Sequence, residues 1–236
     1  MRKEPYSVGS YVHVYNRGTR RMNIVRNDDD RWRFLKLVRY LNDANVPRNW
    51  ERDIGPEHIR QGFVRPDHWD KAQPYVSILG YCLMDNHFHF LFREAEEGGI
   101  SRFMQRLCTS MSAYFNAKYD EGGTLFQGSF QARTVESDRQ LQYLNAYIHI
   151  KNPLERYPGG LSQAIENFED AFEWARQYKF GGLISTMSND FSSLLDHAAI
   201  ADVMVDGHKF KEFAHDVLLG RKIPIDWDRL AIDEWL

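Results

Sequence analysis

The fold is decided by residues 75–94, which read YVSILGYCLMDNHFHFLFRE. Two runs with the composition of β-strands stand on either side of Asp85 and Asn86, and a connection of two residues is typical of a β-hairpin. Side chains point to alternate faces of a strand, so His87 and His89 share one face of the second run. The opposite face, which we assign to the core, carries three phenylalanines: Phe88, Phe90 and Phe92.

Segments on both sides of this hairpin predict a mixed α+β domain. Residues 11–15, YVHVY, alternate as a strand, and Asn27 offers an N-cap for a helix that runs to about Leu41. The stretch GTLFQGSFQARTV contains another short strand. Apolar residues at helical spacing predict a helix over residues 101–119 and another over residues 138–151.

Two other segments depart from this pattern. Residues 44–74 are polar and contain four prolines, which favours a long surface loop. A Pro-Gly-Gly break at residues 158–160 precedes a helical region, with further short helices expected from about Asn189. The sequence therefore predicts one domain over residues 1–157 and a helical C-terminal extension over residues 158–236.

Charge is unevenly distributed along the chain, although the total is only −3 at pH 7. Residues 1–155 hold 22 Lys and Arg against 19 Asp and Glu, a balance of +3, whereas residues 156–236 hold 8 against 14, a balance of −6. Arg17, Arg20 and Arg21 cluster after the first predicted strand. This cluster is a modest footprint for binding phosphates, although a solvated charged loop is the commoner explanation on charge alone.

The composition excludes several classes of protein. No apolar run approaches the roughly 20 residues that span a bilayer, and the N-terminus, MRKEPYSVGS, lacks the apolar stretch of a secretion signal. We therefore expect a cytoplasmic protein without a membrane partner. Two cysteines in 236 residues do not make a disulfide framework, and we expect both to be buried thiols.

The two histidines of the hairpin are candidate metal ligands. Imidazoles at positions i and i+2 of one strand lie side by side, which suits one face of a divalent metal site. The tight hairpin and the intervening phenylalanines favour this interpretation over a pair of surface histidines. We expect the histidine face to be exposed to solvent, and a third ligand must come from another element.

Tyr147 is a candidate nucleophile. It lies on the flank of the apolar stripe of the last predicted helix, where a side chain can reach past the edge of the core. A half-buried structural tyrosine would show the same pattern, and Tyr143 occupies the same flank one turn earlier. The residues alone do not separate the two tyrosines.

The candidate residues lie in segments that resemble a known family. The segment YCLMDNHFHFLF resembles the signature of the transposase superfamily whose HUH motif is two histidines around one hydrophobic residue. VHVYNRGTRRMNIVRNDDDRWRFL and SRFMQRLCTSMSAYFNAKYDEGGTLFQGSFQARTVESD resemble the N-terminal and middle parts of REP-associated tyrosine transposases, and YIHIKNP resembles their tyrosine motif. The resemblance extends from about Tyr11 to Pro153.

The resemblance implies a ferredoxin-like antiparallel sheet with helices packed on one face and the histidines on the other. It also implies metal ligands at His87 and His89, a nucleophile at Tyr147, and Mg²⁺ or Mn²⁺ as the cofactor. In the family the tyrosine attacks single-stranded or hairpin DNA during transposition, which gives a 5′-phosphotyrosine link and a free 3′-hydroxyl. A metal is expected because a phenol with a pKa of about 10 is a poor nucleophile.

One departure from the family concerns the third ligand. The family usually reads Tyr-Ile-His-Leu-Asn-Pro, whereas Lys151 intervenes here and places Asn152 five residues after Tyr147. Four residues of an α-helix return to the same face, and five are displaced by about 140°. The third ligand therefore stays open between Asn152, if the helix unwinds, and His149. Five residues are expected to contact DNA: Arg17, Arg20, Arg21, Gln127 and Arg133.

Two other functions compete with DNA strand transfer. Nucleotide hydrolases of the histidine-triad type also carry alternating histidines, but the third position of such a triad is Leu91 here. A domesticated descendant would bind DNA hairpins without cleaving them, and the displacement of Asn152 is its best support. The family includes dimers and enzymes that act as monomers, so both states stay open.

Overall fold

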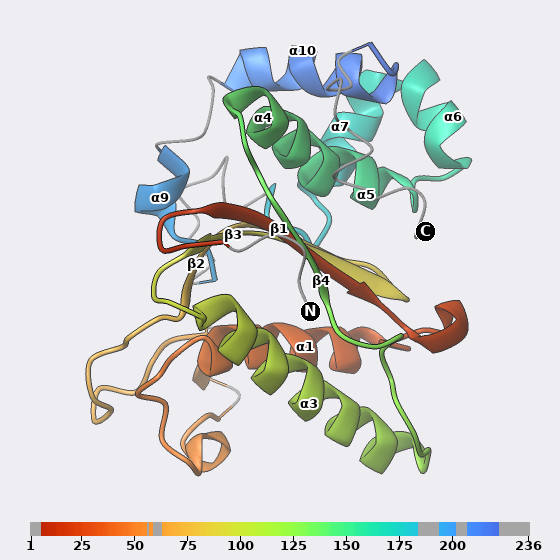
Figure 1. Ribbon diagram of the computed structural model, residues 1–236. Coiled ribbons are helices and arrows are strands. Elements are labelled where there is room, and N and C mark those ends of the chain that lie inside the picture. The colour runs from red at the N-terminus through yellow and green to blue at the C-terminus, as the bar shows by residue number, and fades with distance from the viewer. Residues whose placement is uncertain (1–5, 56, 59–62, 184–193, 202–206, 222–236) are drawn as a thin grey trace.

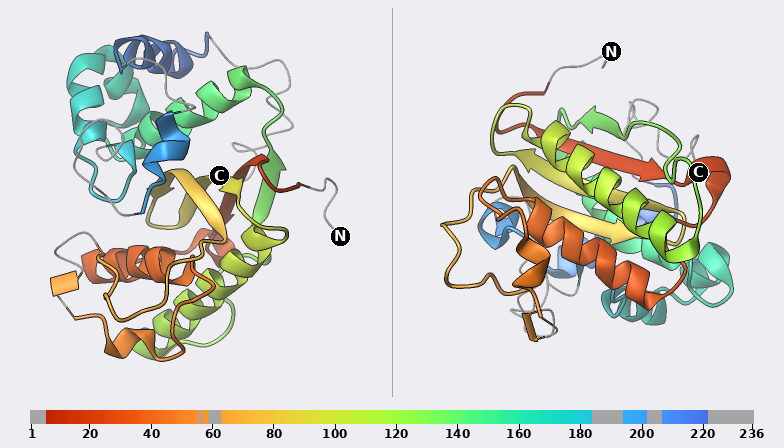
Figure 2. Two further views of the ribbon diagram at one scale, coloured as in Figure 1. Left: turned by 90° about the vertical axis from the view of Figure 1, so that its left-hand side faces the viewer. Right: turned by 90° about the horizontal axis from the view of Figure 1, so that it is seen from below.

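A four-stranded antiparallel sheet lies at the centre of the molecule, with helices on both of its faces (Figures 1 and 2). The computed structural model describes residues 6–55, 57–58, 63–183, 194–201 and 207–221. The strands are β1 (Tyr11–Arg17), β2 (Val76–Leu83), β3 (His87–Glu94) and β4 (Gln131–Thr134). Their order is β2-β3-β1-β4, and every neighbouring pair is antiparallel. With one helix after β1 and another after β3, this is the ferredoxin-like α+β fold that the sequence predicted.

The predicted hairpin forms one half of this sheet, with β2 at the edge and β3 inside. Strand β2 pairs with β3, and across the turn the backbone N–H of Met84 donates to the carbonyl oxygen of His87 at 2.9 Å. Strand β1 lies on the other side of β3, with Tyr15 opposite His89 and His13 opposite Leu91. Because residues opposite each other in a sheet share a face, the side chains of β1 extend the histidine face.

The phenylalanine face of the sheet carries the main core. Helices α1 (Asp28–Leu41) and α3 (Gly99–Tyr119) cover this face, and the ring of Phe34 lies 5.4 Å from the ring of Phe88. The predicted cap is present, since the side chain of Asn27 accepts a hydrogen bond from the backbone N–H of Asp30. Burying each phenylalanine contributes roughly 1.5–3 kcal/mol, so the alternation in β3 fixes which face turns inward.

The histidine face is covered by a second layer of helices. After β4 the chain forms α4 (Asp138–Ala146), the π-helix η3 (Tyr147–Lys151) and α5 (Asn152–Leu154), and η3 contacts β2 and β3. The later helices are α6 (Gly160–Glu166), α7 (Phe168–Arg176), α9 (His197–Ala201) and α10 (Gly207–Leu218). The expectation that the histidine face is open to solvent is therefore wrong, because the apolar side of α4 and η3 is buried against it.

The remaining predictions concern the loop and the C-terminal part. In its described residues the segment 44–74 is largely irregular and contains the short 3-10 helix η2 (Trp50–Arg52). Helices α7 and α10 contact η3 directly, and the boundary near residue 157 stays a prediction. The start of the helices predicted from Asn189 lies outside the described residues.

No helix in the described ranges is long and apolar enough to cross a membrane. Both cysteines are free thiols, but Cys108 is only partly buried.

Candidate active site

The structure brings the predicted histidines and the predicted tyrosine together. The rings of His87 and His89 lie 5.1 Å apart between centroids, and the ring of Tyr147 stands edge-on to His89 at 5.5 Å. His87 is 5% exposed, His89 1% and Tyr147 0%. Tyr147 is therefore enclosed between η3 and the sheet and does not reach past the edge of the core as expected. Tyr143 is also buried, one turn earlier, with its ring 6.4 Å from that of Tyr147.

Each histidine of the pair is held through one ring nitrogen and leaves the other without a partner. Nδ1 of His87 lies 2.6 Å from Oδ1 of Asn86, and Nδ1 of His89 lies 3.0 Å from Nε2 of His13. The Nε2 atoms of both residues are buried and have no hydrogen-bond partner among the described residues. Metal-binding histidines commonly show this pattern, with one nitrogen anchored by a neighbour and the other directed at the ion.

Burial keeps both imidazoles uncharged at neutral pH. Burial lowers the pKa of His87 to about 4, with the charge of Asp85 opposing the shift and that of Arg17 adding to it. Burial also lowers the pKa of His89 well below its usual value, and the neighbouring His87 and His13 contribute further. A neutral imidazole has the free lone pair that a metal ion requires.

A π-helix accommodates Lys151, the residue inserted in the tyrosine motif. In η3 the backbone N–H of Asn152 donates to the carbonyl oxygen of Tyr147, five residues earlier. The hydrogen bond that closes a π-turn joins residues i and i+5, so Asn152 completes one turn after Tyr147. The helix does not unwind before Pro153 but continues through it to Leu154. The side chain of Asn152 is 0% exposed, and its amide atoms have no hydrogen-bond partner among the described residues.

His149, the other candidate for the third ligand, has different neighbours. A Cβ atom at Gly80 would lie 2.7 Å from Nε2 of His149, and one at Gly182 would lie 2.8 Å from its Cε1. The imidazole thus fills a space between β2 and the segment after α7 that only two glycines leave open. Burial lowers the pKa of His149 to about 4.

The donor atoms present at the site fit a divalent cation. Among the described residues, no group of three or more His, Cys, Asp or Glu side chains has the arrangement of a metal site. The buried atoms without partners among the candidate ligands and His13 are instead Nε2 of His87 and of His89, both amide atoms of Asn152, both ring nitrogens of His149 and Nδ1 of His13. Buried polar atoms normally have hydrogen-bond partners, so these donor atoms are suited to a ligand that supplies the missing contacts.

The residues predicted to contact DNA fall into two groups on the histidine face. Arg17 lies opposite His87 in the register of β1 and β3, and its Nε donates to Oε1 of Gln127. The backbone N–H of Gln127 donates in return to the carbonyl oxygen of Arg17 at 2.9 Å. Arg133 lies on β4 opposite His13, half-buried. Arg17 and Gln127 are thus brought together, whereas Arg133 lies opposite His13, four positions from Arg17 along β1.

Arg20 and Arg21 form an exposed, strained turn at the end of β1. Both residues lie in the 3-10 helix η1 (Thr19–Arg21), with φ angles of 52° and 62°. The left-handed region costs a non-glycine residue roughly 1–2 kcal/mol. The turn is tied to the β2–β3 hairpin, because the backbone N–H of Gly18 donates to the carbonyl oxygen of Asn86 at 2.7 Å. Strain of this kind is a pointer to function.

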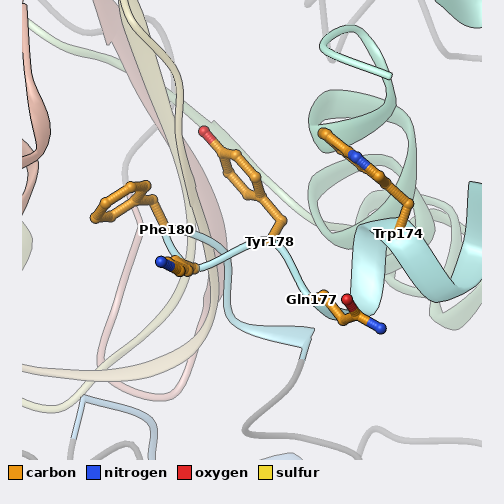
Figure 3. A pocket seen from close by; sticks show the side chains of 5 residues that line it. Trp174, Gln177, Tyr178 and Phe180 are labelled. Atoms are coloured by element: carbon orange, nitrogen blue, oxygen red, sulfur yellow. The ribbon is translucent and has the colours of Figure 1, made fainter. Parts of the chain in front are cut away.

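An aromatic pocket of about 290 Å³ lies apart from the candidate site (Figure 3). Its lining consists of Trp174, Gln177, Tyr178, Lys179 and Phe180. The hydroxyl of Tyr178 donates to the carbonyl oxygen of Leu83 at 2.7 Å, which fixes this segment to the end of β2. Neither the histidine pair nor Tyr147 lines this pocket.

His13 is the residue of the site that the sequence analysis missed. Its ring stacks on that of His89, with centroids 5.2 Å apart and planes 7° apart. The alternation in YVHVY puts His13 and Tyr15 on one face of β1. This alternation was the sequence feature from which His13 could have been identified as a candidate. The pairing of β1 with β3, which brings that face to the histidines, is a tertiary feature.

A buried tyrosine beside a histidine pair on an antiparallel sheet is a site that suits metal-assisted attack on a phosphate. Residues 71–151, which include the hairpin, both histidines and Tyr147, match the model of a family described as transposase IS200 like. This match confirms the predicted resemblance over these residues. None of the curated proteins is significantly similar in sequence. A solved structure of a REP-associated tyrosine transposase bound to a REP hairpin is similar with a TM-score of 0.46 and 13% identity, covering 88% of this chain and 94% of that one.

Proposed function

We propose that the protein is a metal-dependent endonuclease and strand transferase that acts on single-stranded or hairpin DNA in transposition. One observation carries the proposal: Tyr147 lies against His89, which lies against His87, and the Nε2 atoms of both histidines are buried without a hydrogen-bond partner among the described residues. The match of residues 71–151 to a transposase family supports the same reaction class.

In the proposed reaction Tyr147 is the nucleophile. Its phenolic oxygen attacks the phosphorus of a DNA phosphodiester, and the bond from phosphorus to the 3′ oxygen breaks. The phenol loses its proton and the departing 3′ oxygen gains one, so the products are a 5′-phosphotyrosine and a free 3′-hydroxyl. The ester link conserves the energy of the broken bond, and attack by another 3′-hydroxyl rejoins the strand.

His87, His89 and Asn152 are the residues that would hold the cation. When bound, Mg²⁺ or Mn²⁺ would stabilise the negative charge that develops on the phosphate. Asn152 is preferred over His149 as third ligand because the π-turn returns it to the face of Tyr147, whereas His149 is enclosed by Gly80 and Gly182.

The burial of the site implies a movement before cleavage. His87, His89 and Tyr147 are each at most 5% exposed, so a phosphodiester cannot reach them while α4 and η3 lie on the sheet. The strained turn with Arg20 and Arg21, together with Arg17, Gln127 and Arg133, is proposed to bind the DNA backbone beside this entrance.

A domesticated protein that binds hairpins without cleaving them is the alternative. Its support was the displacement of Asn152 by Lys151, but the π-turn in η3 restores the relationship between Asn152 and Tyr147. The displacement of Asn152 therefore no longer supports this alternative, and a cleavage assay decides between the two.

The test uses end-labelled hairpin DNA with a single-stranded flank, incubated with Mn²⁺ or with a chelator. We expect cleavage by the wild type with Mn²⁺ only, and a loss of at least ~100-fold in His87→Ala and His89→Ala. His68→Ala, which changes a histidine that is 69% exposed in its side chain, is the matched control and retains activity. Because His87 and His89 are buried, thermal unfolding of each variant is measured alongside. Full activity in either variant would overturn the metal site, and no cleavage by the wild type would favour the domesticated protein.

A further inference from the structure

His13 is buried at the site but has no role in the reaction as proposed. It is 0% exposed, and its Nε2 lies 3.0 Å from Nδ1 of His89. Tyr15 completes a stack of three rings, with its centroid 4.9 Å from that of His13 and 5.7 Å from that of His89. The stack fixes the plane of His89, and the hydrogen bond fixes its rotation within that plane.

The direction of this hydrogen bond decides whether His89 can bind a cation. A neutral imidazole carries one N–H and one lone pair. If Nδ1 of His89 donates to His13, the lone pair of His89 is on Nε2, the atom without a partner. If His13 donates instead, Nε2 of His89 carries the hydrogen and has no lone pair for a metal. His13 must therefore act as the acceptor in any form of the site that binds a cation.

The pairing of β1 with β3 and β4 determines what lies around His13. Tyr15 lies beside it on β1, His89 on β3 and Arg133 opposite it on β4. His87 has an equivalent support in Asn86, whose Oδ1 can only accept.

We propose that His13 is a positioning residue, which holds His89 in the tautomer with hydrogen on Nδ1 and so presents Nε2 to a divalent cation. This inference rests on the proposed function, because it takes His89 as a ligand. Neighbours that anchor metal-binding histidines in this way typically change metal affinity by about 10- to 100-fold when they are replaced.

Two measurements on the full-length protein without DNA test the proposal. The first is Mn²⁺ affinity, followed by electron paramagnetic resonance of the free ion. His13→Phe keeps a ring in the stack but cannot accept a hydrogen bond, and we expect it to bind Mn²⁺ about 10- to 100-fold more weakly. His13→Gln places an amide oxygen near the position of Nε2, and we expect it to recover most of the affinity. A purely structural role would not predict this rescue.

The second measurement is the tautomer of His89, read from the ¹⁵N spectrum of histidine-labelled wild type without metal. We expect hydrogen on Nδ1, and a spectrum with hydrogen on Nε2 would overturn the proposal without the need for any variant. Equal Mn²⁺ affinity in the wild type and in His13→Phe, with weaker binding in His89→Ala, would also overturn it and leave the proposed function intact. If the wild type binds no Mn²⁺, the proposed function fails at its metal site, and the ¹⁵N spectrum alone then decides the role of His13.

Discussion

The backbone N–H of Asn152 donates to the carbonyl oxygen of Tyr147, five residues earlier, and this bond closes the π-helix η3. In an α-helix the same two residues would lie about 140° apart. The inserted residue, Lys151, is therefore accommodated within this one turn. Its ammonium lies 4.7 Å from the centre of the Tyr147 ring. Isolated π-turns occur frequently at functional sites. Here the turn contains Tyr147, the candidate nucleophile, and is followed directly by Asn152, the candidate ligand.

Deletion of Lys151 is the first prediction. Without this residue Asn152 follows Tyr147 by four positions, and an ordinary α-helical turn keeps the two on one face. We therefore expect the deletion variant to retain cleavage of hairpin DNA and to remain folded. The deletion also removes the Lys151 ammonium from the buried Tyr147 ring, which costs between about 0.5 and 2 kcal/mol. Cleavage rates and thermal unfolding measure the two effects.

The matched control for the deletion is the insertion of one alanine after Lys151. Asn152 would then follow Tyr147 by six positions, which neither an α-turn nor a π-turn can align. A displacement of the reacting groups by about 1 Å can cost ~100-fold in rate, so we expect the insertion to reduce cleavage by at least that factor. Equal loss of activity in the deletion and the insertion would show that alignment of these two residues is not what the turn preserves.

The acid stability of the protein provides a second prediction. Burial lowers the pKa of His149 from 6.5 to about 4, so below pH 6.5 the unfolded chain binds a proton that the folded chain does not. The contribution of neutral His149 to the free energy of unfolding is therefore fully present above pH 6.5, and it is lost as the pH falls toward 4. One pKa unit corresponds to about 1.4 kcal/mol, so His149 accounts for a loss of about 3 kcal/mol over this range.

The test of this linkage compares the wild type with His149→Gln, which has no titratable ring. Urea unfolding at pH 7 and at pH 4.5 gives the free energy of unfolding of each protein. We expect the variant to lose less stability between the two pH values than the wild type does, whatever its stability at pH 7. Parallel losses in both proteins would show that His149 is not the group responsible.

The sequence predicted the elements of the fold better than their relative positions. Alternation in β3 assigned the phenylalanines to the core, and Asn27 marked the start of α1, because both signals are local. The periodicity of residues 138–151 showed that a helix would have one buried side. It did not show that this side would pack against the histidine face of the sheet. The partnership of His13 with His89 joins residues 76 positions apart, and only the pairing of β1 with β3 creates it.

The sequence predicted three residues that lie together in the structure, but it did not predict their environment. His87, His89 and Tyr147 do lie together, but the histidines were expected on an exposed surface and are buried. The choice between Asn152 and His149 depended on the hydrogen-bond pattern of one turn. A π-turn has no clear signature in sequence, because it depends on how the inserted residue is accommodated between the elements that it joins.

DNA binding through the turn at the end of β1 is the third prediction. Arg20 and Arg21 are exposed, and each substitution by alanine that removes one phosphate contact should reduce the slope of log affinity against log salt by about 0.7 for single-stranded DNA. Arg17→Ala should have a similar effect and also release Gln127. Affinity for a hairpin is expected to exceed that for a plain duplex. Fluorescence anisotropy in a salt titration measures both quantities.

The control for this series is Arg48→Ala, which replaces an arginine in the loop between α1 and η2. It changes the net charge by the same amount as the other substitutions, so it separates a local contact from a general decrease in positive charge. We expect an unchanged slope for this variant. A slope that falls equally in all four variants, or equal affinity for hairpin and duplex, would contradict the assignment.

The last prediction concerns the nucleophile. Tyr147 and Tyr143 are both buried on the same side of the helix, and the ring of Tyr147 is the one that stands against His89. Tyr147→Phe removes one oxygen and keeps the ring packing, so we expect normal hairpin binding, a similar unfolding temperature and no covalent adduct. Tyr143→Phe is the matched control and should retain the adduct. Each protein is incubated with labelled hairpin DNA and Mn²⁺, and the products are separated under denaturing conditions, where a phosphotyrosine link survives. A band that persists in Tyr147→Phe and disappears in Tyr143→Phe would move the nucleophile one turn earlier, to a residue that reaches the histidines only if α4 shifts along the sheet.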